Sequence, residues 1–188
     1  MDALDQLKGD LRFVRAAVAK ADRHESPATI YFLWAIVGFW GFALVDFRDT
    51  WAPLYWSIAG PVGFVASAYL GWRHARRRGQ VTDAAGVRSL LHWGGMLGAV
   101  FLAVLIPANG FMPWDGLGPA ILLILMLGYF QAGIHLDRPF LWIGLLMGAG
   151  YLFVMFVSAY AWTVVGLVVA MALAIAGLRG GRPHEAAA

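Results

Sequence analysis

The sequence predicts an all-α, polytopic integral membrane protein, with about six transmembrane helices in a compact bundle and an N-terminal amphipathic helix. Of its 188 residues, 61% are hydrophobic and 13% are charged, whereas roughly 25% of the residues in a soluble domain are charged. Charges occur in a few short stretches, and the uncharged runs between them can cross a hydrocarbon core of about 30 Å. Such continuous apolarity indicates helices, because barrel strands alternate apolar and polar residues over only about ten positions.

The individual spans follow from the positions of charges and turn-forming residues. Only Asp46 to Thr50 separate the first two spans, so these form a hairpin, and a loop rich in Pro and Gly over 107–116 separates the third span from the fourth. Pro139 provides a proline at the first helical position of the fifth span. The spans are expected, within a few residues, at 28–45, 51–72, 89–106, 117–134, 139–158 and 160–178.

The last two spans share one long uncharged run. No charged residue occurs in the 40 residues from Pro139 to Leu178. As a single helix this run would be about 60 Å long, twice the hydrocarbon thickness, so the chain must turn back within it. We place the turn near Ser158 to Tyr160, because Tyr160 and Trp162 are amphipathic aromatic residues that favour a membrane interface.

Basic residues predict that both ends of the chain are cytoplasmic, because the insertion machinery tends to leave Lys and Arg on that side. With six spans, Arg48 is the only one of the 14 Lys and Arg residues on the outer side. The chain is therefore expected to be a multi-pass protein of a bacterial-type inner membrane. Residues 1–27 and 179–188 would be cytoplasmic, and residues 28–178 would form the transmembrane domain.

Apolar residues in the N-terminal segment recur at intervals of three and four, the period of one face of a helix. Charged residues occupy the other faces. We expect a helix that lies on the membrane surface, packs on the bundle or binds a cytoplasmic partner protein. The stripe consists of Leu4, Leu7, Leu11, Val14 and Val18.

An arginine-rich sequence directly follows the second span and contains Arg73, Arg76, Arg77 and Arg78. Its main expected role is to anchor and orient the protein on the anionic headgroups of the bilayer, where each charge contributes on the order of 1 kcal/mol. Contact with an acidic protein partner is the alternative. No interleaved aromatic residues or known fold indicate nucleic-acid binding, so we expect none.

Two histidines lie near the cytoplasmic edge of neighbouring spans, His92 at the start of the third and His135 at the end of the fourth. They could meet, and with Asp137 and Gln131 they form a candidate ligand or proton site. Neutral imidazoles ligate haem iron or a divalent metal, and a carboxylate can orient them. The simpler interpretation is interfacial hydrogen bonding, because two histidines make only half of an ordinary metal shell. We therefore predict no cofactor and no metal, with haem as the alternative.

Proline and glycine within the second span indicate a kink. Pro61 lies between Gly60 and Gly63, and a kink there would free backbone carbonyl groups at depth and could mark an internal cavity. The simpler interpretation is a kink that neighbouring helices satisfy. Glycine pairs at four-residue spacing favour close helix packing, either within the bundle or in a homo-oligomer. These pairs are Gly94 with Gly98 and Gly144 with Gly148.

The sequence favours a non-catalytic function. It lacks cysteine, zinc-protease, nucleophile-elbow and phosphate-loop motifs, so we expect no enzymatic activity. The leading hypothesis is a membrane sensor or accessory subunit that binds a partner through its basic cytoplasmic face. The first alternative is a small transporter or channel for a small or apolar solute, and the second is a haem- or metal-binding redox protein that uses His92 and His135.

Overall fold

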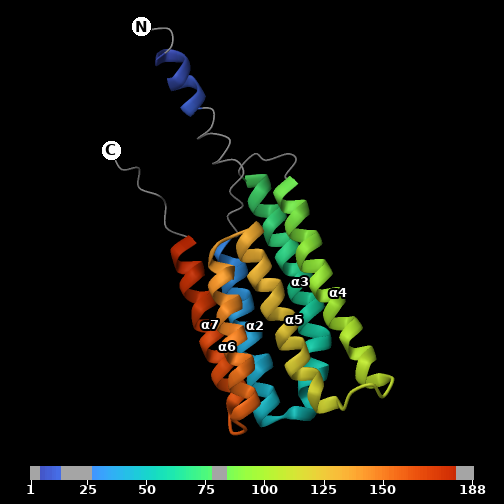
Figure 1. Ribbon diagram of the computed structural model, residues 1–188. Helices are drawn as coiled ribbons and strands as arrows, with labels where there is room; N and C mark the ends of the chain where they lie inside the picture. The colour runs from blue at the N-terminus through green and yellow to red at the C-terminus, as the bar shows by residue number, and fades with distance from the viewer. Residues whose placement is uncertain (1–4, 14–26, 78–83, 181–188) are drawn as a thin grey trace.

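The computed structural model describes residues 5–13, 27–77 and 84–180. These residues form helices with short connections and contain no β-strand, so the predicted all-helical class is confirmed. Residues 5–13 are helical, and the long helices pack into a bundle (Figure 1). The bounds of the long helices are α2 Ala28–Phe47, α3 Ala52–Arg77, α4 Ala84–Ala108, α5 Leu117–His135, α6 Pro139–Phe156 and α7 Ala161–Gly180. Short 3₁₀ helices, η1 Asp49–Trp51 and η2 Trp114–Gly116, precede α3 and α5.

Among the described residues, five helices are long and apolar enough to cross a membrane: α2, α4, α5 with its preceding 3₁₀ turn, α6 and α7. The chain is therefore a membrane protein built as a helical bundle. α3 is not among the five, although the sequence predicts a span at 51–72. Its uncharged part contains Gly, Ser, Pro, Tyr and Trp, which lower its mean hydropathy without adding charge.

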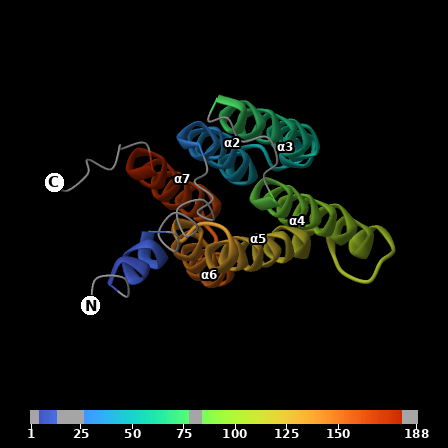
Figure 2. The ribbon, with the colours of Figure 1, turned by 90° about the horizontal axis from the view of Figure 1, so that it is seen from above.

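The long helices form a closed ring. Each helix contacts its neighbours in the sequence, and α7 closes the ring against α2. Viewed along its axis, the bundle has two layers, with α7, α2 and α3 in one and α6, α5 and α4 in the other (Figure 2). Packing is most extensive between α2 and α7 and between α5 and α6, whereas α4 is the least buried of the five candidate spans. The bundle is thus tightly packed on one side and looser around α4.

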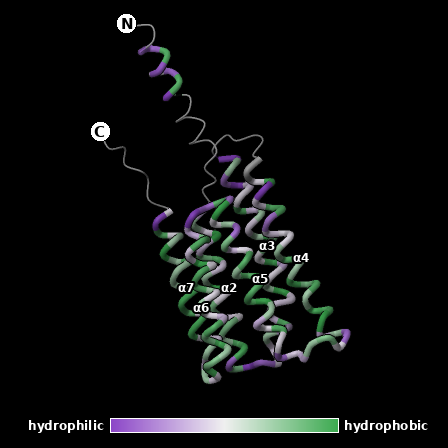
Figure 3. Tube along the Cα trace, viewed as in Figure 1, coloured by the Kyte–Doolittle hydropathy of each residue, from purple (hydrophilic) through white to green (hydrophobic). Residues whose placement is uncertain are grey.

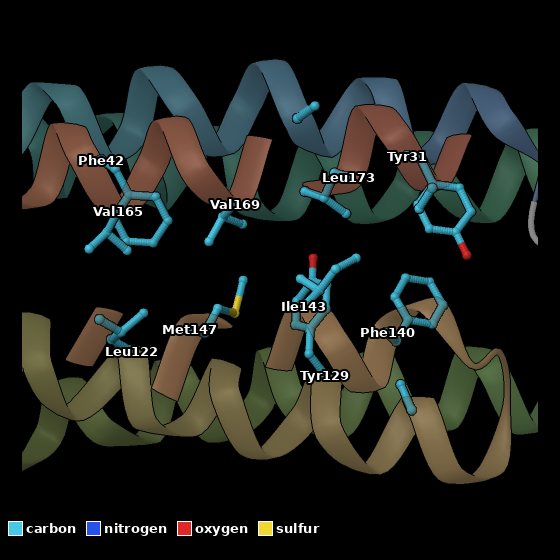
Figure 4. Packing of buried hydrophobic residues seen from close by; sticks show 13 residues of the cluster. Tyr31, Phe42, Leu122, Tyr129, Phe140, Ile143, Met147, Val165, Val169 and Leu173 are labelled. Atoms are coloured by element: carbon cyan, nitrogen blue, oxygen red, sulfur yellow. The ribbon is translucent and has the colours of Figure 1, made fainter. Parts of the chain in front are cut away.

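Apolar side chains fill the space between the two layers (Figure 4). Leu122 of α5 and Ile143 of α6 are almost fully buried. Trp34 of α2 and both Trp93 and Met96 of α4 pack against the same cluster. Lipid tails are as apolar as these side chains, so the helices associate mainly through van der Waals contact. The shape of the side chains therefore determines how well the bundle holds together.

Glycines bring the backbones of α5 and α6 into close contact. A Cβ atom at Gly144 would lie 2.5 Å from the backbone nitrogen of Phe130 and 3.0 Å from the carbonyl oxygen of Met126. A Cβ atom at Gly133 would overlap the backbone of Leu141. The missing side chains thus allow the backbones themselves to approach, as is typical of small residues in membrane helices.

A short turn joins α6 to α7 at the end of the bundle where α2 finishes. α6 ends at Phe156 and α7 begins at Ala161, on either side of the turn that the sequence predicts near Tyr160. Tyr160 has a φ of 54°, which is uncommon for a bulky residue. Asp46 of α2 accepts hydrogen bonds from the backbone nitrogen and the hydroxyl of Thr163, at 2.7 and 2.6 Å. The carboxylate therefore ties the end of α2 to the first turn of α7.

Candidate functional site

Basic side chains of the long helices and their described connections gather at one end of the bundle, which we call the basic end. They are Arg73, Arg76 and Arg77 in α3, Arg88 in α4, Arg138 before α6 and Arg179 in α7, and all are exposed. Arg48, after α2, lies at the opposite end. Hydrophilic residues are concentrated at the bundle ends and hydrophobic residues along its length (Figure 3). The basic end therefore presents positive charge to anionic headgroups or to an acidic partner.

One arginine of the predicted cluster stacks on an aromatic ring. The guanidinium carbon of Arg76 lies 4.8 Å from the ring centroid of Trp72, in a cation–π contact. Both side chains are exposed, and Trp is favoured at the membrane–water interface. Arg73 and Arg77 form no ion pair with any described residue, and Arg78 lies outside the described residues. The described arginines thus have the exposure needed to bind headgroups or a partner.

A carboxylate at the basic end links three segments of the chain. Asp137, between α5 and α6, accepts a hydrogen bond of 2.7 Å from the hydroxyl of Tyr31 in α2. Tyr31 is only 2% exposed and stacks on Phe140, with ring centroids 5.1 Å apart. The backbone nitrogen of Asp137 donates to Ala132, and its carbonyl oxygen accepts from Phe140, both at 3.1 Å. Asp137 therefore holds the corner between α5 and α6 against α2.

Aromatic side chains from four helices meet just inside the basic end, in a group that we call the aromatic cluster: Tyr31, Trp93, Tyr129 and Phe140. The ring of Trp93 lies 5.0 Å from that of Tyr129 and 5.2 Å from that of Phe140, both edge to face. Figure 4 shows Tyr31 and Phe140 facing each other across the core. Each such pair contributes about 0.5 to 1.5 kcal/mol beyond its buried area. The cluster thereby attaches the loosely packed α4 to α5 and α6.

The two candidate histidines have different surroundings. Nε2 of His92 lies 2.9 Å from the carbonyl oxygen of Gly128 in α5. Gly128 precedes His135 by seven residues, which is about 10 Å along the helix axis. His135 and Gln131 are exposed, and the Asp137 carboxylate bonds to α2. Across residues 5–13, 27–77 and 84–180, no three or more His, Cys, Asp or Glu side chains are grouped to hold a metal ion. The structure thus brings His92 to the α5 backbone instead of pairing it with His135.

The predicted kink residues serve as packing positions on α3. The helix continues through Pro61, and both Gly60 and Gly63 are buried. The ring of Trp34 from α2 covers Gly63, where a Cβ atom would lie 3.1 Å from the ring, and Gly60 faces α4. Neighbouring helices α2 and α4 thus contact the proline-containing segment of α3.

The N-terminal stripe falls only partly within the described residues. Leu7 and Leu11 belong to the helical stretch 5–13 and are 59% and 50% exposed. They are one helical turn apart, so they share a face. Leu4, Val14 and Val18 lie outside the described residues, and the stripe as a whole stays a prediction.

Two long-range contacts were not predicted from the sequence. Tyr31 and Asp137 are 106 residues apart, and Asp46 and Thr163 are 117 residues apart. The sequence did place both residues of each pair at the same end of the predicted spans and therefore at similar depth in the membrane. A carboxylate at the edge of an apolar helix needs hydrogen-bond donors there. Depth alone did not show which helices are neighbours across the ring.

Comparisons with models of protein families, with curated proteins and with solved structures gave no significant match. The function proposed below therefore depends on the residues and contacts of this chain.

Proposed function

We propose that this chain is a non-catalytic membrane protein that acts as a sensor or accessory subunit and binds a cytoplasmic protein. The observation that carries the proposal is the exposed apolar pair Leu7 and Leu11, which share one face of a helical segment that also carries charged residues. Exposed apolar surface rimmed by polar residues is typical of a binding site, and burying each leucine contributes about 1.5 to 3 kcal/mol. The arginines of the basic end would supply charge complementary to an acidic partner.

The filled core favours anchoring or sensing over transport. Leu122, Ile143 and Met147 occupy the centre of the ring, and among the described residues the only buried side chains with polar atoms are those of Tyr31 and Tyr129. A solute pathway generally requires polar or ionisable groups at membrane depth. The apolar filling therefore supports a bundle that holds its basic end at the membrane surface.

We place both ends of the chain in the cytoplasm of a bacterial-type cell, with α3 as a sixth span of the inner membrane. α2 finishes at the end opposite the basic end, and α4 starts at the basic end, so α3 must return the chain over the same distance (Figure 1). Its 26 residues give a helix about 39 Å long, which exceeds the hydrocarbon thickness of about 30 Å. Arg48 is the only basic residue that this arrangement puts outside.

Thiol labelling tests this orientation, because the chain has no cysteine of its own. Asp115→Cys and Gly180→Cys change exposed positions at opposite ends of the bundle. In intact cells, an impermeant thiol reagent should label the Asp115→Cys variant, and it should label the Gly180→Cys variant only after permeabilisation. Reversed labelling would invert the orientation, and labelling of both variants from outside would mean that an even number of spans separates the two positions.

The partner-binding proposal predicts that Leu7→Asp combined with Leu11→Asp abolishes co-purification of a stoichiometric cytoplasmic protein. The two carboxylates would have to be buried in the contact, which is strongly unfavourable for charges without partners. The measurement is the composition of the detergent-purified complex, together with the thermal stability of the bundle. Stability should not change, because the stripe would contact the partner and not the bundle.

A matched control separates the apolar face from the added charge. Gln6→Asp combined with Gly9→Asp adds the same charge on other faces of the helix, and nothing lies within 4 Å of the Cβ position at Gly9. This control variant should retain the partner. A wild-type preparation that never retains a cytoplasmic protein, but that mediates solute flux in liposomes, would overturn the proposal in favour of a transporter.

A further inference from the structure

An apolar groove runs along α2 and α3 at the end opposite the basic end, and its volume is about 640 Å³. α3 lines it with Leu54, Ile58 and Val62, each more than half exposed, and α2 contributes Leu44. Residues four apart share one helix face, so the α3 side chains form a continuous apolar stripe. Because these side chains lie on the membrane-facing surface, the groove opens towards the lipid.

The groove fits within one leaflet of the bilayer. Its lining residues on α3 run from Leu54 to Val62, a rise of about 12 Å, which is less than half of the hydrocarbon thickness of about 30 Å. Trp51, at the mouth of the groove, is exposed, and Trp is favoured at the level of the headgroups. Tyr55 also lines the groove, but its hydroxyl donates to the carbonyl oxygen of Val37 at 2.8 Å. The phenol therefore presents mainly its ring to an occupant.

A charged side chain lies at the mouth of this groove. Arg48 lines it, and in the part of the chain that the structure describes, its guanidinium forms no ion pair and no hydrogen bond. The neighbouring carboxylates bond elsewhere, Asp46 with Thr163 and Asp49 with the backbone nitrogen of Thr50. A guanidinium has the planar set of donors that binds a phosphate through two hydrogen bonds.

We propose that the groove binds a glycerophospholipid from the leaflet opposite the basic end. Its phosphate would bind Arg48, and one acyl chain would lie along Leu54, Ile58 and Val62. This inference is independent of the partner-binding function, because the two sites use opposite ends of the bundle.

Lipid titration of the purified full-length protein tests the phosphate contact. Native mass spectrometry would compare dihexanoyl phosphatidylglycerol with dihexanoylglycerol, which has the same acyl chains and no phosphate. The wild-type protein should bind the phospholipid at least about tenfold more tightly, because a hydrogen bond to a charged group is worth that factor or more. Arg48→Gln should remove the part of this preference that the groove supplies, which is about tenfold in affinity. The control Arg12→Gln changes an exposed basic residue outside both the groove and the basic end, and it should keep the preference.

A second pair of variants tests whether the acyl chain lies in the groove. Ile58→Trp should fill the groove and weaken binding of both lipids, whereas Ile134→Trp, at an exposed position on α5, should weaken neither. Inorganic phosphate should fail to displace the phospholipid. Equal affinity of the wild-type protein for the two lipids, an undiminished preference in Arg48→Gln, or displacement by inorganic phosphate would each overturn the lipid site.

Discussion

Replacing Gly144 by valine is expected to lower the free energy of unfolding by about 3 kcal/mol, the upper part of the usual range for overpacking a core. The first atom of any side chain there would meet the backbone of α5, with Phe130 N at 2.5 Å and Met126 O at 3.0 Å. A backbone cannot move aside as a flexible side chain can, so α6 would have to shift away from α5. Thermal unfolding in detergent, followed by circular dichroism, measures the loss.

Gly98→Val is the matched control, because Gly98 also lies within a candidate span, α4, and nothing lies within 4 Å of its Cβ position. Both variants introduce the same β-branched residue into a membrane helix, so the difference between them reports the contact between α5 and α6. We expect a small change for Gly98→Val. Equal losses in the two variants would show that helix propensity, and not close packing, determines the stability at Gly144.

Hydropathy and charge were sufficient to predict the helical class, because lipid penalises unpaired charges and unsatisfied backbone groups so strongly. Helix ends were harder to place. We predicted that the third span begins at residue 89, whereas α4 begins at Ala84, and the second was expected to stop at residue 72, whereas α3 continues to Arg77. Charged residues leave the hydrocarbon but can remain helical, and arginines favour the last turn of a helix. A span predicted from hydropathy and charge therefore marks the part of a helix that lies in the hydrocarbon, and not where the helix begins and ends.

The candidate sites depended on which helices are neighbours, and a single sequence does not contain that information. His92 and His135 were expected at similar depth, yet His92 bonds to the carbonyl oxygen of Gly128, which any residue type would offer. Tyr31 and Asp137 meet because α2 and the corner between α5 and α6 lie on facing sides of the ring. Side-chain chemistry indicated which groups need partners, and only the packing of the bundle selected those partners.

Replacing Asp46 by alanine is expected to lower the free energy of unfolding by about 2 to 3 kcal/mol, because hydrogen bonds to charged groups are worth about 1.5 to 3 kcal/mol. The carboxylate accepts both the backbone nitrogen and the hydroxyl of Thr163. Thr163 lies in the first turn of α7, where backbone N–H groups have no partner within the helix. Asp46 thus caps α7 from another helix and also holds the turn in which Tyr160 has a positive φ. Urea or thermal unfolding in detergent measures the effect.

A double-mutant cycle with Thr163→Val separates this cap from other roles of Asp46. Thr163→Val removes the hydroxyl and keeps the backbone donor, so alone it should cost about 1 kcal/mol. In the Asp46→Ala background the same change should cost much less, because its acceptor is already gone. Asp46→Asn keeps an acceptor oxygen but loses the charge that is favourable at a helix N-terminus. Its free energy of unfolding should therefore lie between those of the wild type and Asp46→Ala. Additive losses in the cycle would mean that Asp46 stabilises the bundle without acting through Thr163.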